Sequence, residues 1–155
     1  RSHSLEHMMF KGRAKRGPGE ASRILRDLGA EENAFTSDDY TAYYQVLARD
    51  RLPVALELEA DRLASLRLPA DEFSREIEVI KEERRLRTDD QPNAKAFELF
   101  RAMAYPASGY HTPTIGWMAD LDRLKAEELR HWHEPWYAPN NDTLAVAGDA
   151  TVDEG

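Results

Sequence analysis

The first seven residues hold the pattern that most constrains this chain, His3-x-x-Glu6-His7. In an α-helix, residues three and four positions apart lie on one face. A helix over residues 3–10 would therefore present both imidazoles on one side, with the Glu6 carboxylate beside them. Neutral imidazoles from successive turns are good ligands for zinc. The pattern predicts a helical metal site.

The order of these residues reverses the more common H-E-x-x-H arrangement of zinc peptidases. A catalytic zinc site has three protein ligands and an open position for water. A glutamate that is not a ligand can accept the proton of that water. His3 and His7 are therefore candidate ligands and Glu6 is a candidate general base. On the motif alone, two histidines with no shared function are the alternative.

The composition predicts one globular domain without disulfides. The chain has 155 residues, of which 41% are hydrophobic and 32% charged, and it has no cysteine. A chain of this size buries roughly 70% of its unfolded surface. Its net charge of −8 argues against nucleic acid and anionic membranes as partners. No apolar run approaches the ~20 residues that a membrane span needs.

A basic stretch follows the motif, with Lys11, Arg13, Lys15 and Arg16. Glycine and proline interrupt it between residues 12 and 19, which is typical of a loop. We expect these cations to be solvated. A contact with an acidic substrate is the alternative.

Periodicity and breaking residues predict helices alternating with a few strands. The expected helices cover residues 3–10, 18–29, 52–65, 69–88, 94–104 and 126–132. The β-branched and aromatic residues between 33 and 47 predict two short strands or one bent strand. Residues 143–147 predict a buried strand. This order indicates an α+β or α/β fold, with helices packed against a sheet.

The third metal ligand is sought in the predicted helix 69–88. Glu76 and Glu83 are two turns apart and share a face, with Val79 and Ile80 between them. A carboxylate on an apolar stripe is costly to bury without a partner, and a metal ion would supply one. The alternative is a wet surface on which Glu82 and Glu83 pair with the arginines of residues 84–87.

Residues 3–12, H-S-L-E-H-M-M-F-K-G, resemble the active-site signature of the pitrilysin/insulinase family, which includes mitochondrial processing peptidase. Residues 75–83 resemble that family's Glu-Arg-x-Val-Ile-x-x-Glu segment, in which a distal Glu is the third zinc ligand. The resemblance implies that Glu83 is the third ligand and that Glu76 orients a ligand histidine or tunes the site. Glu82 is the neighbouring alternative, but its side chain points about 120° away from Glu76 on the helix.

Three further segments resemble family blocks in the family's order. They are residues 33–43, 110–116 and 136–149. The resemblance implies an α+β fold in which helices pack on a mostly antiparallel sheet, as in the processing-peptidase half-domain. It also implies that substrate docks in extended form along the strand region 33–47, where Asn33, Ala34 and Phe35 are the matching positions. Phe35 either lines a pocket or belongs to the core.

The implied activity is that of a zinc-dependent endopeptidase, with Zn²⁺ as cofactor and extended or unfolded peptides as substrates. A non-catalytic partner or scaffold subunit of the same fold is the alternative. Family members pair this domain with a second, similar domain or subunit. We therefore expect residues 1–155 to form one partial catalytic domain, truncated at both ends, that hydrolyses peptides poorly alone. The compartment stays open, with a preference for the periplasm because similar bacterial proteins are often exported.

Overall fold

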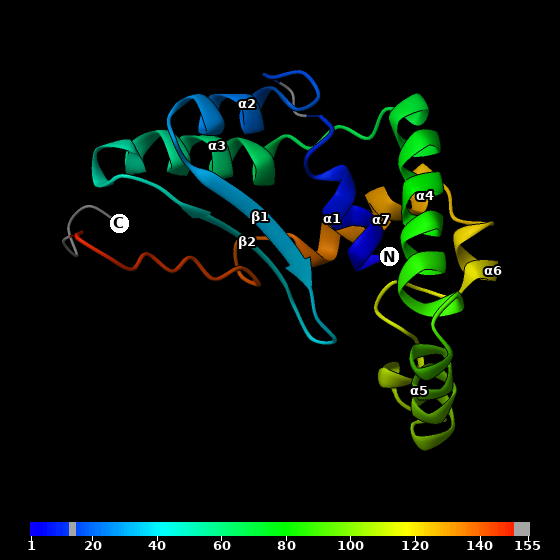
Figure 1. Cartoon of the computed structure of the whole chain (residues 1–155). Coiled ribbons are helices and arrows are strands. Elements are labelled where there is room, and N and C mark those ends of the chain that lie inside the picture. The colour runs from blue at the N-terminus through cyan, green and yellow to red at the C-terminus, as the bar shows by residue number, and fades with distance from the viewer. Residues whose placement is uncertain (13–14, 151–155) are drawn as a thin grey trace.

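A two-stranded hairpin and two groups of helices make up the chain (Figure 1). The computed structural model describes residues 1–12 and 15–150. The elements are α1 (Ser2–Met8), α2 (Glu20–Asp27), β1 (Glu31–Thr36), β2 (Thr41–Val46), η1 (Arg49–Arg51), α3 (Leu52–Ala64), α4 (Ala70–Arg84), η2 (Arg85–Asp89), α5 (Pro92–Ala104), η3 (Gly109–His111), α6 (Met118–Leu121) and α7 (Ala126–Trp136).

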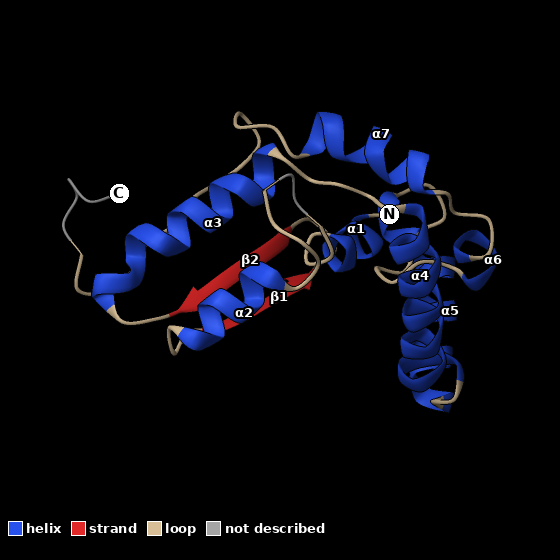
Figure 2. Cartoon of the chain, turned by 90° about the horizontal axis from the view of Figure 1, so that it is seen from above, coloured by secondary structure: helices blue, strands red, loops and turns tan. Residues whose placement is uncertain are grey.

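The sheet is an antiparallel pair, β1 with β2, in a register that runs from Glu31 opposite Val46 to Thr36 opposite Thr41. Helices α2 and α3 lie over the hairpin in both views (Figures 1 and 2). A small cluster of Ala21, Leu25 and Leu58 joins these two helices. Helices on an antiparallel sheet confirm the α+β prediction.

Helix α1 lies between the hairpin and α4, and it contacts β1, α4 and α7. The apolar residues of α4 recur at the spacing of one helical face. They pack on the apolar side of α1 and the residue after it, in a core that contains Leu5, Met8, Met9, Phe73, Ile77, Ile80, Leu121 and Leu129. Full burial of one such side chain contributes about 1.5–3 kcal/mol. This core fixes the motif helix against α4.

The ends of α4 follow from local chemistry. Pro69 before it is extended, Asp71 and Glu72 lie in the first turn, and Lys81 and Arg84 lie in the last turn. Acids at the start and bases at the end complement the helix dipole. The predicted helix 69–88 is regular to residue 84 and continues as a π-helical turn over 85–89.

Three local predictions need correction. The helix predicted over 3–10 ends at Met8. Val79 is 51% exposed although Ile80 is buried, because one residue step turns the side chain by about 100°. Residues 143–147 are exposed and form no strand. In the described part of the chain the only sheet is the β1–β2 pair, so this segment has no neighbouring strand to pair with.

The basic stretch is also more structured than expected. Lys11 Nζ lies 2.8 Å from Glu76 Oε2. Arg16 pairs with Glu57 at 2.9 Å and with Asp61 at 3.2 Å. The prediction of a solvated loop is wrong for these two cations, because acids from α3 and α4 lie against them. Arg13 lies outside the described residues.

Within residues 1–12 and 15–150, no helix has the length and apolar character needed to cross a membrane.

Candidate metal centre

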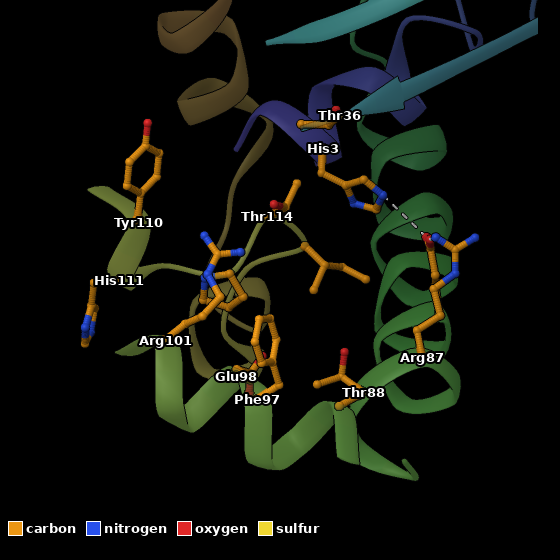
Figure 3. Close-up of a pocket in the computed structure, with 14 residues that line it drawn as sticks. His3, Thr36, Arg87, Thr88, Phe97, Glu98, Arg101, Tyr110, His111 and Thr114 are labelled. Carbon is orange, nitrogen blue, oxygen red and sulfur yellow. Dashed lines mark ion pairs between the residues drawn. The ribbon is translucent and has the colours of Figure 1, made fainter. Parts of the chain in front are cut away.

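His3, His7 and Glu83 come together where α1 crosses α4. One ligand-type atom from each lies within 4.8 Å of the others. Glu83 Oε2 is 3.6 Å from His3 Nε2 and 3.3 Å from His7 Nε2. Figure 3 shows the His3 ring and the contact that joins it to the α4 carboxylate. The three residues predicted as ligands therefore face a common point.

Glu76 sets the orientation of the His7 ring. His7 Nδ1 lies 2.8 Å from Glu76 Oε1, and its N–H donates a hydrogen bond to this carboxylate oxygen. This contact leaves Nε2 of the same ring directed at Glu83. Burial raises the pKa of Glu76, but hydrogen bonds from Lys11 and His7 outweigh it and lower the pKa overall. Glu76 is thus held as an anion, as expected for a carboxylate that orients a ligand histidine.

His3 is neutral near pH 7. Burial, together with the neighbouring His7, lowers the pKa of His3 to about 4. Metal binding requires the unprotonated imidazole, so no proton has to be removed first. Its buried Nδ1 atom has no hydrogen-bond partner among the described residues. The Nε2 atom of the same ring is the one that faces Glu83.

The two oxygens of Glu83 have different environments. Arg87 Nη1 lies 2.7 Å from Oε1, whereas Oε2 faces the two imidazoles. Arg85 pairs with the neighbouring Glu82. The sequence offered a surface ion pair as an alternative to a ligand role for Glu83. In the structure one oxygen of Glu83 forms the ion pair with Arg87, and the other oxygen faces the two histidines.

Glu6 lies beside the cluster but is held by the sheet. It is 9% exposed, and its Oε2 accepts a hydrogen bond from Thr36 Oγ1. Thr36 Oγ1 also lies 3.0 Å from Thr41 Oγ1 of the paired strand. Glu6 directly precedes His7 in the sequence and is not part of the ligand cluster.

Thr36, Lys11 and Arg87 were not recognised from the sequence as parts of the site. The sequence did contain a signal for Thr36. Side chains alternate along a strand, so Thr36 lies on the same face of β1 as Ala34, which is a predicted substrate-binding position. Lys11 reaches the site only through a tertiary contact with α4, and no local pattern indicates that this cation would do so. Arg87 lies four residues after Glu83, a spacing that predicts an ion pair on a helix.

Asn33, Ala34 and Phe35 lie on β1, apart from the ligand cluster. Phe35 is 44% exposed and its ring contacts Tyr40 at 5.7 Å and Tyr44 at 6.5 Å between centroids. It is therefore not a core residue. The Asn33 side-chain oxygen accepts a hydrogen bond from the Ala34 N–H at 2.8 Å.

The donor set and its spacing suit zinc. Tetrahedral zinc with bonds of about 2.0–2.2 Å places its ligand atoms roughly 3.3–3.6 Å apart. The distances from Glu83 Oε2 to the two Nε2 atoms are 3.3 and 3.6 Å. Two neutral imidazoles and one carboxylate are also a ligand set that catalytic zinc sites use. The residues present therefore fit this ion.

Comparison with other proteins identifies relatives of the same kind. The insulinase family (peptidase family M16) matches residues 1–116. Zinc protease PqqE of Helicobacter pylori is 36% identical over 148 residues, which cover 96% of this chain and 33% of that protein. An uncharacterized zinc protease of Mycobacterium leprae is 31% identical over 153 residues, covering 99% of this chain and 34% of that protein.

Solved structures agree. The crystal structure of a protease from Helicobacter pylori matches with a TM-score of 0.88 at 36% identity, over 90% of this chain and 34% of that chain. The first half of the periplasmic protease PqqL from Escherichia coli matches with a TM-score of 0.77 at 23% identity, over 90% of this chain and 31% of that chain. The second likeness supports the fold alone.

The chain spans about a third of the length of these relatives. The family match covers most of the chain and includes α1 and α4, the two helices that carry the ligand cluster. The resemblance seen in the sequence is thereby confirmed, and the chain belongs to the insulinase family of peptidases, M16.

Proposed function

We propose that this chain is the zinc-binding part of an endopeptidase that hydrolyses extended or unfolded peptides. His3, His7 and Glu83 would hold the zinc ion, and Glu6 would be the general base. The observation that carries this proposal is the position of Glu83 Oε2, which faces Nε2 of both histidines at distances of 3.3 and 3.6 Å. The zinc protease names of the relatives support the choice of metal.

Zinc, when bound, polarises the scissile carbonyl and lowers the pKa of water toward ~7. Side chains of the protein would carry out the proton transfers and hold the ligands in position. Glu6 accepts a proton from the attacking water, whose oxygen bonds to the carbonyl carbon. The carbon–nitrogen bond then breaks, and Glu6 returns the proton to the leaving nitrogen. Thr36 holds the Glu6 carboxylate for both transfers, Glu76 holds the His7 ring and Arg87 holds Glu83.

The proposed substrate path follows β1. In the described part of the chain β1 pairs only with β2, so its other edge has backbone groups that an extended peptide can pair with. Asn33, Ala34 and Phe35 would lie along this peptide. Backbone pairing is indifferent to side chains, which suits a peptidase that acts on unfolded segments.

The motif helix, the strand region 33–47 and the helix that carries Glu83 would form one partial catalytic domain over residues 1–155. The relatives are about three times as long, so a second domain or subunit would complete the substrate chamber.

The proposed compartment is the periplasm. Fractionation of the native cells would test this location, and recovery of the protein in the cytosol alone would overturn it.

Metal content and hydrolysis together test the proposed function. We expect the zinc-loaded chain to retain one zinc ion after dialysis, by mass spectrometry of the metal. Glu83→Gln and His7→Ala should lose it, whereas Glu82→Gln, a matched change on the exposed neighbour, should keep it. Glu6→Gln should keep zinc but lose at least 100-fold in cleavage of a quenched fluorescent peptide by the complete gene product.

The scaffold alternative makes the opposite prediction. A non-catalytic subunit would show no hydrolysis in the complete gene product, and Glu6→Gln would change nothing. Glu6 directly precedes the proposed ligand His7 and accepts a hydrogen bond from Thr36, which favours the enzyme, because a scaffold does not require an oriented base at this position.

A further inference from the structure

A row of hydroxyl groups extends from the Glu6 carboxylate, made of Thr36, Thr41, Tyr137 and Tyr43. Thr36 Oγ1 donates to Glu6 Oε2, and Thr41 Oγ1 lies 3.0 Å from Thr36 Oγ1. The Thr41 side chain is also hydrogen-bonded to Tyr137, whose hydroxyl oxygen lies 3.1 Å from that of Tyr43. This hydroxyl row therefore joins the motif helix α1 to both strands of the hairpin and to the end of α7.

The chemistry of the hydroxyl row determines the direction of its hydrogen bonds. A carboxylate only accepts, and a hydroxyl has one hydrogen to donate. Because Thr36 gives its hydrogen to Glu6, it must accept the hydrogen of Thr41. By the same rule Thr41 accepts from Tyr137, and Tyr137 accepts from Tyr43. Every hydroxyl hydrogen then points toward Glu6, and bonds aligned in this way polarise and strengthen one another.

Packing fixes both phenol rings of the hydroxyl row. The His133 ring stacks on Tyr137 with 5.1 Å between centroids. The fully buried Arg62 guanidinium lies 4.8 Å from the centroid of the Tyr43 ring and 4.7 Å from that of Phe10. Burial also raises the pKa of both tyrosines, so each keeps the hydrogen that it donates.

The connection of the hydroxyl row to Glu6 indicates its use. Thr36 holds one oxygen of Glu6, but a threonine hydroxyl can rotate to another partner unless its accepting side is also bound. Thr41 binds that side, and Tyr137 binds Thr41 in turn. The proposed mechanism needs the Glu6 carboxylate in one place for two proton transfers, because a misplaced catalytic group lowers the rate.

We propose that Tyr137 is a positioning residue for the general base: through Thr41 and Thr36, its hydroxyl holds the Glu6 carboxylate for both proton transfers. The inference rests on the proposed function and adds a residue that lies outside the two helices of the metal centre. The competing explanation is that the Tyr137 hydroxyl only fastens the end of α7 to the hairpin.

Kinetics of the complete, zinc-loaded gene product on a quenched fluorescent peptide test this role. Tyr137→Phe keeps the ring and removes the hydroxyl. We expect kcat to fall roughly three- to ten-fold, as for the loss of one hydrogen bond, while KM and zinc content stay unchanged. The matched control is Tyr44→Phe, which removes a hydroxyl from the 46% exposed residue next to Tyr43 and should change none of the three.

A double-mutant cycle separates the positioning role from a structural one. If Tyr137 acts through Thr36, the double variant Thr36→Val/Tyr137→Phe should be no slower than Thr36→Val alone. Losses that multiply in the double variant would overturn the proposal. A wild-type kcat in Tyr137→Phe would also overturn it, whatever the stability of that variant.

If the wild type cuts no peptide, the proposed function fails, and crystal structures decide the positioning role. The Glu6 carboxylate should occupy one position in the wild type and more than one in Tyr137→Phe. The same carboxylate positions in both proteins would overturn the proposal.

Discussion

His7 Nδ1 lies 2.8 Å from Glu76 Oε1, and this contact joins two residues on different helices, α1 and α4. It determines which nitrogen of His7 remains available to a metal ion. Because Lys11 holds the other oxygen of Glu76 at 2.8 Å, the carboxylate is fixed from two sides. The His7 ring is thus oriented by contacts within the protein.

Glu76→Ala should therefore weaken zinc binding without removing a ligand. Loss of a carboxylate that orients a ligand histidine typically costs about 10–100-fold in metal affinity. Competition with a fluorescent zinc chelator measures the change. The control is Glu78→Ala, which removes a 63% exposed carboxylate from the same helix. Equal affinity in the two variants would contradict an orienting role for Glu76.

Arg87→Ala should have a smaller effect of the same kind. Its guanidinium holds Glu83 Oε1 at 2.7 Å, but the side chain is 75% exposed. Exposed ion pairs contribute about 0.2–1 kcal/mol, so we expect at most a roughly five-fold loss of zinc affinity that shrinks at high salt. Arg85→Ala, which removes the partner of Glu82, should change nothing. A loss as large as that of Glu83→Gln would show that Arg87 has another role.

Thr36→Val should separate catalysis from metal binding. The substitution keeps the shape of the side chain and removes the hydrogen bond that Glu6 Oε2 accepts. A misplaced general base lowers kcat, and we expect a fall of roughly ten-fold with unchanged zinc content. Thr36→Ser retains the hydroxyl and should recover most of the activity. Full activity of the valine variant would exclude a positioning role.

Arg84 and Glu98 form a buried ion pair that joins α4 to α5. Arg84 also donates to the Gly116 carbonyl at 2.8 Å. Removing Glu98 takes away the two shortest acidic contacts of the buried Arg84 and leaves Asp89 at 3.4 Å as its remaining acidic partner, so Glu98→Leu should lower the free energy of unfolding by about 3 kcal/mol. Urea denaturation measures it. The double variant Arg84→Met/Glu98→Leu should recover part of the loss, and additive losses would contradict the pairing.

His133 should make stability depend on pH below neutrality. Burial lowers the pKa of His133, although the acids Asp142 and Glu134 oppose the shift. The unfolded chain therefore binds a proton near pH 6.5 before the folded chain does. The contribution of neutral His133 to the free energy of unfolding is complete above about pH 6.5. It is lost as the pH falls toward the pKa of His133 in the folded chain. The difference in unfolding free energy between the wild type and His133→Gln should change between pH 7 and 5, and a constant difference would contradict it.

The parts of this site that the sequence predicts are those with a short-range pattern. The spacing of His3 and His7 is read within one helix, and that of Glu76 and Glu83 within another. The resemblance to a known family then implied that the two helices contribute to one metal site. Residue spacing within each helix does not show that the helices meet. The β-branched and aromatic residues predicted two short strands or one bent strand over residues 33–47, and the structure has two strands, β1 and β2, in an antiparallel pair.

The remaining features depend on contacts between distant segments. Lys11 looks like any loop cation until α4 brings Glu76 against it. Thr36 looks like an ordinary strand residue until α1 brings Glu6 to it. Residues 143–147 have the composition of a strand, but a strand also needs a partner, and local propensity does not supply one.

X-ray absorption at the zinc edge tests the central claim most directly. In the zinc-loaded wild type we expect two imidazole nitrogens and a carboxylate oxygen around the ion, at about 2.0–2.2 Å. Glu83→Gln should change this spectrum or abolish zinc binding, whereas Glu82→Gln should leave the spectrum unchanged. A wild-type spectrum without two imidazole ligands, or one that Glu83→Gln does not alter, would contradict the assignment of His3, His7 and Glu83 as the metal centre.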